Sequence, residues 1–170
     1  MLVIMVGLPQ SGKSTFIDMV AAKCCHEMDI IRPSDWYPSD IDDIDQNSRT
    51  DYQLVAWEYA LDKISAVLAS SIDKRLIVLD TCGATPGSLR TVFGVAKIHK
   101  HTIAAIFIAT PRGVCDSRID PLVVDKYISK IHDAVLEYNK MCNKLIIVKY
   151  DDISKWNTKA VEVAEQLCQI

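Results

Sequence analysis

The stretch at residues 7–14, with the sequence GLPQSGKS, constrains the fold of this chain more than any other part of it. It follows an apolar run at residues 2–6 and leads into residues 15–20, an order that predicts a strand, a tight loop and a helix. Two glycines five positions apart let successive backbone amides point into one hollow, and the helix adds the positive end of its dipole. A glycine turn that binds nothing is the alternative, but this pattern should arise by chance in well under roughly 1% of chains this short. The loop is therefore predicted to bind the phosphates of a nucleoside triphosphate.

The polar residues of this loop each have a place in that chemistry. Lys13 is predicted to be catalytic, because it can reach the outer phosphates as a point charge. Ser14 is placed to ligate, through its hydroxyl, the Mg²⁺ that bridges them. The remaining residues expected to contact the nucleotide from this loop are Gly7, Pro9, Gln10, Ser11, Gly12 and Thr15.

Composition narrows the class of protein. A chain of 170 residues is long enough for one well-buried core, so we expect a single domain over residues 1–170. The net charge of −3 disfavours a protein that tracks along nucleic acid, since coating that backbone requires a dense cationic face. No run approaches the roughly 20 apolar residues that cross a membrane, and the first strand leads directly into the loop, so we expect a cytoplasmic protein.

The six cysteines form no CxxC pair and have no regular spacing. We expect them to be reduced, half-buried and without zinc.

Apolar periodicity predicts alternating strands and helices along the rest of the chain. The expected strands cover residues 2–6, 29–32, 76–79, 102–109 and 144–149, and the expected helices follow the loop and cover residues 51–72, 88–99, 121–140 and 158–169. Right-handed crossovers between parallel strands place helices on both faces of a sheet. The predicted fold class is therefore α/β, a doubly wound five-stranded parallel sheet.

Two segments in the first half leave alternatives open. Residues 39–50 are acidic and without a period, and they lack the glycine and terminal Glu of a calcium loop, so a solvated loop is expected. Trp57 and Tyr59, in the helix expected at residues 51–72, could stack on a base, but Trp57 lies on the apolar stripe of that helix, where packing in the core is the alternative.

Two carboxylates follow predicted strands. Asp35 lies between Pro33 and Pro38 in the loop after the second strand, and Asp80 ends the apolar run at residues 76–79. The carboxyl ends of parallel strands form the edge at which ligands bind. Asp80 is therefore predicted to orient Mg²⁺ through a bound water, with a turn-capping role as the alternative.

Residues 110–121 are charged and bounded by prolines, which predicts a short lid. Arg112 and Arg118 are candidates to meet the transferring phosphoryl group, because guanidinium suits spread negative charge. Either arginine could instead be a surface residue paired with Asp116 or Asp120.

The chain resembles the kinase domain of phage-type 5′-polynucleotide kinases in four features that occur in the same order. These are the loop at residues 7–15, Asp35, the Leu79-Asp80-Thr81 segment and a lid arginine ahead of a helix that starts with proline. The resemblance implies a P-loop kinase fold with the first strand central and the Asp80 strand beside it. It also implies ATP as the donor, Asp35 as the general base and Arg118 as the lid arginine that stabilises the γ-phosphoryl group. One carboxylate suffices for such chemistry, which needs positioning more than covalent help.

The sequence departs from that family at three places. Gln10 stands where a glycine is usual, Pro38 stands where an arginine usually holds the acceptor's phosphate, and the lid lacks a second arginine after Arg118. Arg49, Arg90 or Arg112 could substitute for the missing arginines.

Three functions remain open at this point. The first is a kinase that moves the γ-phosphate of ATP to a hydroxyl of a polynucleotide 5′ end or a nucleotide. The second is a kinase of the same fold that acts on a small metabolite or a nucleoside monophosphate. With a monophosphate, Asp35 would only orient the acceptor, because a phosphate needs no base. The third is a nucleotide-dependent switch. The sequence disfavours it, because no NKxD-like guanine signature follows the fourth strand.

Overall fold

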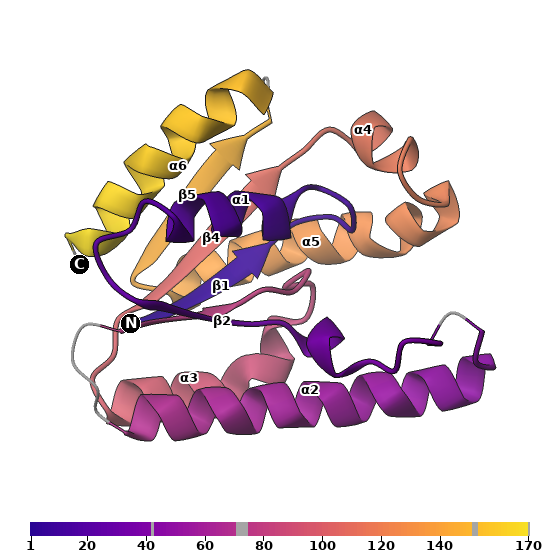
Figure 1. Cartoon of the computed structure of the whole chain (residues 1–170), viewed down its shortest axis with the longest axis horizontal. Helices are drawn as coiled ribbons and strands as arrows, with labels where there is room; N and C mark the ends of the chain where they lie inside the picture. Colours follow the sequence, from indigo (N-terminus) through magenta and orange to yellow (C-terminus); the bar gives the residue numbers. More distant parts are fainter. Residues whose placement is uncertain (42, 71–74, 151–152, 170) are drawn as a thin grey trace.

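The computed structural model describes residues 1–41, 43–70, 75–150 and 153–169. Its centre is a five-stranded parallel sheet with the strand order β2-β3-β1-β4-β5 (Figure 1). The strands are β1 (Leu2–Val6), β2 (Met28–Ile31), β3 (Leu76–Leu79), β4 (Ile103–Ala109) and β5 (Lys144–Lys149). The predicted fold class is confirmed, including the central first strand with the Asp80 strand beside it.

Alternation along each strand divides the core into two halves, because successive side chains of a strand point to opposite faces. In β1, Leu2 and Ile4 belong to one buried cluster, whereas Val3 and Met5 belong to the other. Both faces of the central strand are therefore apolar and covered, as expected of a parallel sheet.

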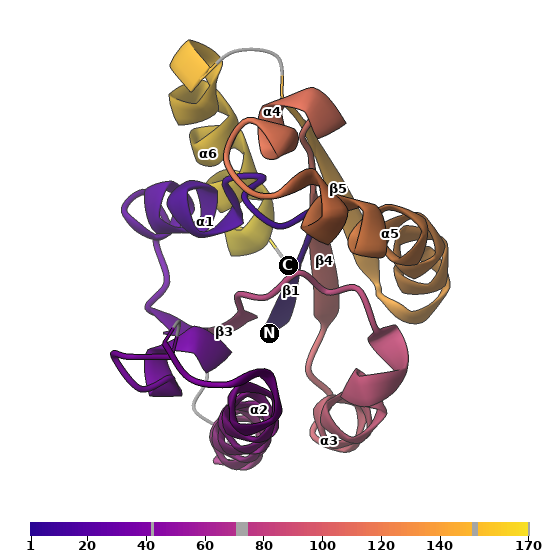
Figure 2. The same cartoon turned by 90° about the vertical axis from the view of Figure 1, so that its right-hand side faces the viewer.

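Helices cover both faces, as predicted (Figure 2). The helices and short helical turns are α1 (Lys13–Ala21), η1 (Pro33–Trp36), α2 (Gln46–Ala69), η2 (Pro86–Leu89), α3 (Arg90–Ile98), α4 (Arg112–Asp116), α5 (Pro121–Met141) and α6 (Ile153–Cys168). Buried residues of α1 and α6 pack on one face of the sheet, and those of α2, α3 and α5 pack on the other. Among the described residues, no helix combines the length and apolar composition that crossing a bilayer requires.

The second helix begins earlier than expected. We predicted a loop over residues 39–50, but α2 begins at Gln46, so the prediction is wrong for its last five residues. The reason is Asp45, whose carboxylate accepts hydrogen bonds from the backbone amides of Asn47 (3.0 Å) and Ser48 (3.2 Å) and thereby caps the helix. The hydroxyl of Ser48 also donates to this carboxylate at 2.7 Å, and that bond, followed by those from the backbone amides, lowers the pKa of Asp45. The end of the helix predicted for residues 51–72, at residues 71–72, lies outside the described residues.

The last helix also begins earlier, at Ile153 instead of residue 158. The prediction rested on the apolar stripe from Ala160 to Leu167 and missed that Trp156 extends it by one turn. Trp156 is 3% exposed and packs edge-on against Phe16 of α1, with ring centroids 5.5 Å apart. This contact joins the last helix to the helix that follows the phosphate loop.

The cysteines differ from expectation in two ways: Cys115 is buried and Cys25 exposed instead of half-buried, and two of the cysteines are oxidised. Cys25, which follows α1, and Cys168, at the end of α6, form a disulfide. Their separation of 143 residues leaves no local pattern in the sequence from which the pairing could be predicted. Cys24, Cys82, Cys115 and Cys142 are free thiols.

Candidate active site

The phosphate loop, residues 7–14, connects β1 to α1 and is held by the exits of two neighbouring strands. The backbone amide of Gly7 donates to the carbonyl of Cys82, just after β3, at 3.1 Å. The hydroxyl of Thr110, just after β4, donates to the carbonyl of Ser11 at 2.8 Å. The loop is therefore fixed in shape by the edge of the sheet at which ligands bind in this type of fold.

Gly12 makes the close approach of α6 to this loop feasible. Its φ of 88° lies in the left-handed region, and a Cβ added to it would stand 2.4 Å from Cη2 of Trp156. Both conditions require glycine at this position. Gln10 also has a positive φ, 59°, at the position where the resembled family has glycine.

Lys13 is almost fully buried, with 8% of its surface exposed. Its ammonium donates to the carbonyl of Leu8 at 2.7 Å and lies 3.4 Å from the hydroxyl of Ser11. The side chain of Lys13 thus folds back across the loop. Ser14 and Thr15, in the first turn of α1, are exposed, so the hydroxyl of Ser14 is free to meet a metal ion.

Asp80 is buried directly after β3, with 6% of its surface exposed. Its Oδ2 accepts from Nε of Arg32 at 2.9 Å, and Arg32 also pairs with Asp18 of α1. Burial alone would lower the pKa of Arg32, but the two carboxylates outweigh this and raise it. A buried carboxylate and an exposed serine hydroxyl are hard oxygen ligands of the kind that Mg²⁺ prefers, so this pair fits the predicted metal.

Asp35 lies in the short turn η1, which follows β2 at the same edge of the sheet. It is exposed, and its backbone amide donates to the carbonyl of Arg32 at 3.0 Å. Asp35 is thereby held three residues from the arginine that pairs with Asp80, on a turn that packs against α2.

The two candidate lid arginines differ in their contacts. Arg118, two residues after α4, donates from Nη1 to the carbonyl of Gln10 in the phosphate loop at 3.0 Å. Arg112 instead pairs with Asp116 at 3.0 Å and with Asp125 of α5 at 2.8 Å. The hydrogen bond to Asp116 is the main reason that the pKa of Arg112 is raised. The structure therefore brings Arg118, but not Arg112, into contact with the loop.

An open groove of about 410 Å³, which we call the aromatic groove, lies on the β3 side of the loop. Its lining residues are Tyr37, Thr50, Gln53, Leu54, Trp57, Thr81, Cys82, Gly83, Ala84, Thr85, Ser88, Leu89, Tyr127 and Tyr138. None of these described lining residues carries a charged side chain. The groove therefore offers aromatic faces and hydroxyl groups, and no cation, to a ligand.

Cys82 joins the aromatic groove to the phosphate loop. Burial raises the pKa of its thiol, and the ammonium of Lys13, which lies beside it, opposes that shift. Burial also raises the pKa of Tyr37 and of Tyr127, so both hydroxyls are neutral at neutral pH. The hydroxyl of Tyr138 is buried with no hydrogen-bond partner among the described residues.

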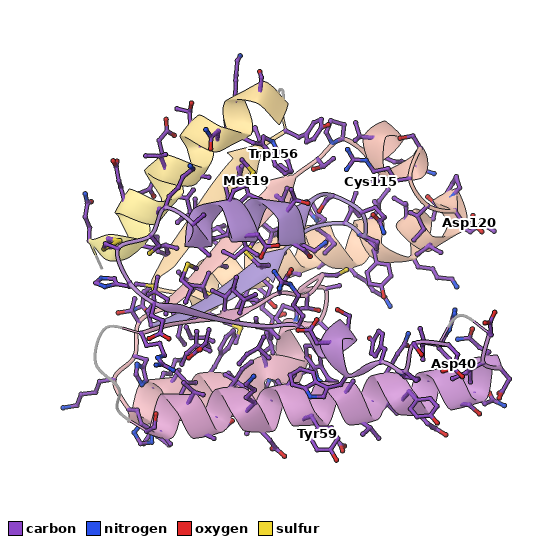
Figure 3. The ribbon with its side chains drawn as sticks, viewed as in Figure 1. Met19, Asp40, Tyr59, Cys115, Asp120 and Trp156 are labelled. Carbon is purple, nitrogen blue, oxygen red and sulfur yellow. A yellow bond between two sulfur atoms is a disulfide. The ribbon has the colours of Figure 1, made fainter. Side chains whose placement is uncertain are left out.

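A second hollow of about 400 Å³, the Arg118 hollow, lies on the other side of the loop. It is lined by Gln10, Gly12, Thr15, Met19, Arg118 and Trp156. Figure 3 shows Met19 on α1 and Trp156 on α6, close to each other on the face away from α2. The phosphate loop therefore lies between two openings that differ in chemistry.

The sequence singles out the loop, both carboxylates and Arg118 as candidates, but several residues around them were not predicted to have a role. The sequence left Trp57 open between core and ligand stacking, and in the structure Trp57 is half-buried, packed against one core cluster and part of the groove lining. It gave no role to Arg32, Cys82 or Trp156. These three residues contact segments that are far from them in the chain, so no local spacing in the sequence could predict their roles.

Comparison with known proteins identifies a family. A family model described as AAA domain matches residues 2–141, more than half of the chain. No curated protein matches the sequence.

Solved structures share the fold at low sequence identity. A gluconokinase from Sinorhizobium meliloti 1021 is 13% identical with a TM-score of 0.62, and the alignment covers 98% of this chain and 93% of that one. The Mycobacterium tuberculosis APS kinase CysC, in complex with AMPPNP and APS, is 14% identical with a TM-score of 0.60, over 99% of this chain and 97% of that one. Chaetomium thermophilum Kti12, in complex with ADP-AlF3, is 14% identical with a TM-score of 0.57, over 99% of both chains. The fold is that of P-loop kinases.

Proposed function

The chain belongs to the AAA domain family, and from this premise we propose that it is an ATP-dependent kinase that transfers the γ-phosphate to a hydroxyl group of an acceptor. One observation carries the proposal: the phosphate loop, with Lys13 folded over it, lies between the Arg118 hollow and the aromatic groove. A phosphoryl transfer needs a donor and an acceptor on opposite sides of the transferred group.

On the donor side, the backbone amides of the loop and the ammonium of Lys13 hold the phosphates of ATP. Ser14 and Asp80 would hold Mg²⁺, which neutralises charge on the phosphates when it is bound. Arg32 holds the carboxylate of Asp80 in place through its 2.9 Å hydrogen bond. The nucleoside occupies the Arg118 hollow, against Met19 and Trp156.

Two side chains act on the transfer itself. Asp35 accepts the proton of the attacking hydroxyl, as the resemblance to polynucleotide kinases implies. Arg118, already in contact with Gln10 of the loop, stabilises the charge that spreads over the transferring phosphoryl group. Arg112 is held by two carboxylates and has no part in the proposal beyond placing α4 against α5.

The acceptor enters through the aromatic groove. Trp57, Tyr37 and Tyr127 offer faces on which a base can stack, and Tyr138 offers a buried donor without a partner among the described residues. We therefore favour a nucleotide-type acceptor, a polynucleotide 5′ end or a nucleoside, held by its uncharged base.

A second candidate acceptor is a small metabolite. It is favoured by the lack of a cation among the described lining residues, since an acceptor that carries phosphates gains nothing there. Two of the similar structures, a gluconokinase and an APS kinase, bear the names of kinases of small molecules.

The test is a screen of transfer from γ-labelled ATP. The acceptors are a 5′-OH oligonucleotide, nucleosides, nucleoside monophosphates, gluconate and no acceptor, each with wild type, Asp35→Asn and the control Asp40→Asn. Asp40 is an exposed carboxylate of the same segment. We expect transfer to oligonucleotide or nucleoside that Asp35→Asn abolishes, with ATP binding retained and Asp40→Asn unaffected.

Other outcomes would redirect or end the proposal. Transfer to gluconate or another small molecule alone would replace the favoured acceptor with the second candidate. Transfer to monophosphates alone would rule out the role of Asp35 as general base, because a phosphate acceptor needs no base. Hydrolysis that no acceptor stimulates would favour a nucleotide-dependent switch and contradict the kinase.

A further inference from the structure

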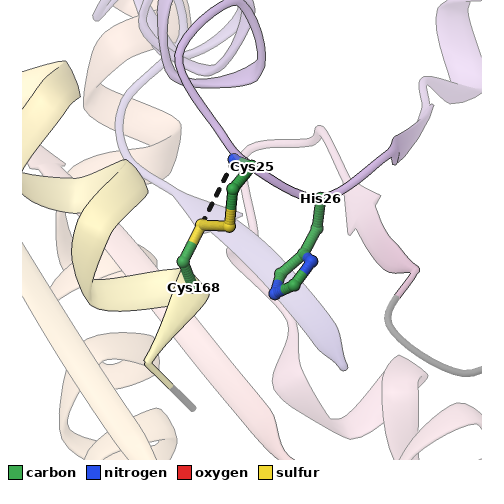
Figure 4. A group of neighbouring side chains, drawn as sticks. All are labelled: Cys25, His26 and Cys168. Carbon is green, nitrogen blue, oxygen red and sulfur yellow. Dashed lines mark hydrogen bonds between the residues drawn. A yellow bond between two sulfur atoms is a disulfide. The ribbon is translucent and has the colours of Figure 1, made fainter.

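A cluster of sulfur and nitrogen ligands lies at the end of α1 and α6 away from the phosphate loop. We call Cys24, Cys25, His26 and Cys168 the cysteine cluster. Cys24, Cys25 and His26 are consecutive residues between α1 and β2, and Cys168 ends α6. Figure 4 shows Cys25, His26 and Cys168 side by side. The ligand atoms of Cys25, His26 and Cys168 lie within 4.8 Å of one another, and Sγ of Cys24 lies 3.5 Å from Sγ of Cys168.

We propose that this cluster, once the Cys25–Cys168 disulfide is reduced, is a zinc site in which Cys25, His26 and Cys168 are ligands and Cys24 is the fourth. The site is separate from the proposed kinase chemistry, which takes place at the opposite ends of α1 and α6.

The set of ligands suits zinc. Three thiolates and one imidazole form a combination found in structural zinc sites, and soft sulfur ligands disfavour Mg²⁺ or Ca²⁺. A tetrahedral ion with Zn–S bonds of about 2.3 Å places its ligand atoms about 3.5–4 Å apart. The separation of 3.5 Å between the sulfurs of Cys24 and Cys168 already matches this geometry.

The surroundings of the sulfurs also fit. The backbone amide of Cys25 lies 3.3 Å from Sγ of Cys168 and donates to it, and N–H donors of this kind orient and stabilise metal-bound thiolates. The scaffold does not depend on the metal, because Val20 of α1 and Leu167 of α6 belong to one buried core cluster. Cys25 is exposed and His26 half-buried, so an ion has a path of entry.

The filled site has a cation near it. Zinc with three thiolates carries a net charge of −1, and His26 shares the lining of a neighbouring pocket with Lys100. Arg75, in the same lining, is already paired with Glu27 and Asp29, so the offset of this negative charge comes from Lys100.

The disulfide and the metal are alternative states of the same sulfurs. A dithiol reductant supplies two electrons and two protons, which convert the Cys25–Cys168 disulfide to two thiols while the reductant becomes a cyclic disulfide. Zinc then displaces the thiol protons to solvent as it binds. Zinc is therefore expected to bind only to the reduced protein.

The test compares the reduced and oxidised forms of the full chain without any affinity tag. The reduced protein is freed of reductant and metal and then titrated with Zn²⁺ against a chromophoric chelator, and separately with Co²⁺, whose spectrum reports thiolate ligands in tetrahedral geometry. We expect one zinc ion per reduced chain, a thiolate-to-cobalt absorption, and no binding by the oxidised protein. The oxidised form is a control that needs no substitution.

Variants assign the ligands. Cys168→Ser should weaken zinc binding by more than about 100-fold, beyond the loss expected when only an outer-shell partner is removed, and His26→Gln should weaken it as well. The matched control is Cys142→Ser, a free half-buried cysteine outside the cluster. The absence of zinc binding by reduced wild type, or undiminished binding by a Cys168→Ser protein with wild-type circular dichroism, would overturn the proposal.

Discussion

The two sides of the phosphate loop are built in different ways. The Arg118 hollow takes most of its lining from one continuous stretch, Gln10, Gly12, Thr15 and Met19, to which Arg118 and Trp156 are added from later in the chain. The aromatic groove draws on η1, α2, the segment after β3 and α5, which are far apart in the chain. The proposed donor site is therefore built mainly around one local motif, whereas the proposed acceptor site depends on tertiary packing throughout.

This difference explains why the sequence identifies a kinase more readily than its substrate. Backbone amides, a lysine and a hydroxyl suffice for any nucleoside triphosphate, and their spacing is fixed by a single loop. The proposed acceptor site instead uses faces such as those of Trp57 and Tyr127, which meet only when the helices pack. Substitutions on the two sides should therefore have separable effects.

The largest effect should come from the centre of the donor side. Replacing Lys13 with alanine removes the ammonium that lies over the loop, so kcat should fall by about 10²–10³-fold, as when a transition-state donor is lost. Steady-state kinetics with labelled ATP checks this, with Lys23→Ala, an exposed lysine just after α1, as the control. A Lys13→Ala enzyme as active as the control would contradict the donor site.

The lid arginines give a smaller effect that distinguishes two neighbouring residues. Arg118→Ala should lower kcat by about 10- to 150-fold. This fold-change corresponds to the loss of one hydrogen bond to a charged group, which contributes about 1.5–3 kcal/mol. Arg112→Ala should leave kcat near that of wild type, because Arg112 pairs with Asp116 and Asp125. Equal losses in the two variants would mean that the lid rearranges when ATP binds.

Gly12 tests how α6 supports the donor side. Gly12→Ala forces a Cβ toward Trp156 in a backbone conformation that alanine rarely adopts, so the free energy of unfolding should fall by about 1–3 kcal/mol. Chemical denaturation measures the change. Gly94→Ala, within α3, is the control, because a Cβ there meets nothing within 4 Å and should stabilise the helix by about 0.5–1 kcal/mol. Equal unfolding free energies for the two variants would show that the close contact carries no strain.

Much of the fold could be predicted from the sequence, because its signals are local. The apolar runs that became β1 and β3 stand next to Gly7 and Asp80, and the doubly wound order follows from the alternation of strands and helices. The start of α2 was predicted wrongly, since its cap, Asp45, stands among other acidic residues that carry no period.

The candidate site was predictable only where its residues belong to motifs. The loop, Asp35, Asp80 and Arg118 carry such signals, although the roles proposed for them remain predictions. The pair of Arg32 and Asp80 spans 48 residues, and the Cys25–Cys168 disulfide spans 143. Contacts at such separations depend on packing, which no spacing in the sequence encodes.

The most direct test of the division between donor and acceptor is the KM of each substrate for Trp57→Ala. We predict that the KM of the acceptor rises by about 5- to 150-fold, the cost of about 1–3 kcal/mol for losing one stacked aromatic ring, while the KM of ATP stays unchanged. Tyr59→Ala is the matched control, an aromatic residue of the same helix that is 59% exposed and points to solvent in Figure 3. A rise in the KM of ATP, or no difference between Trp57→Ala and Tyr59→Ala in the KM of the acceptor, would contradict the assignment of the aromatic groove.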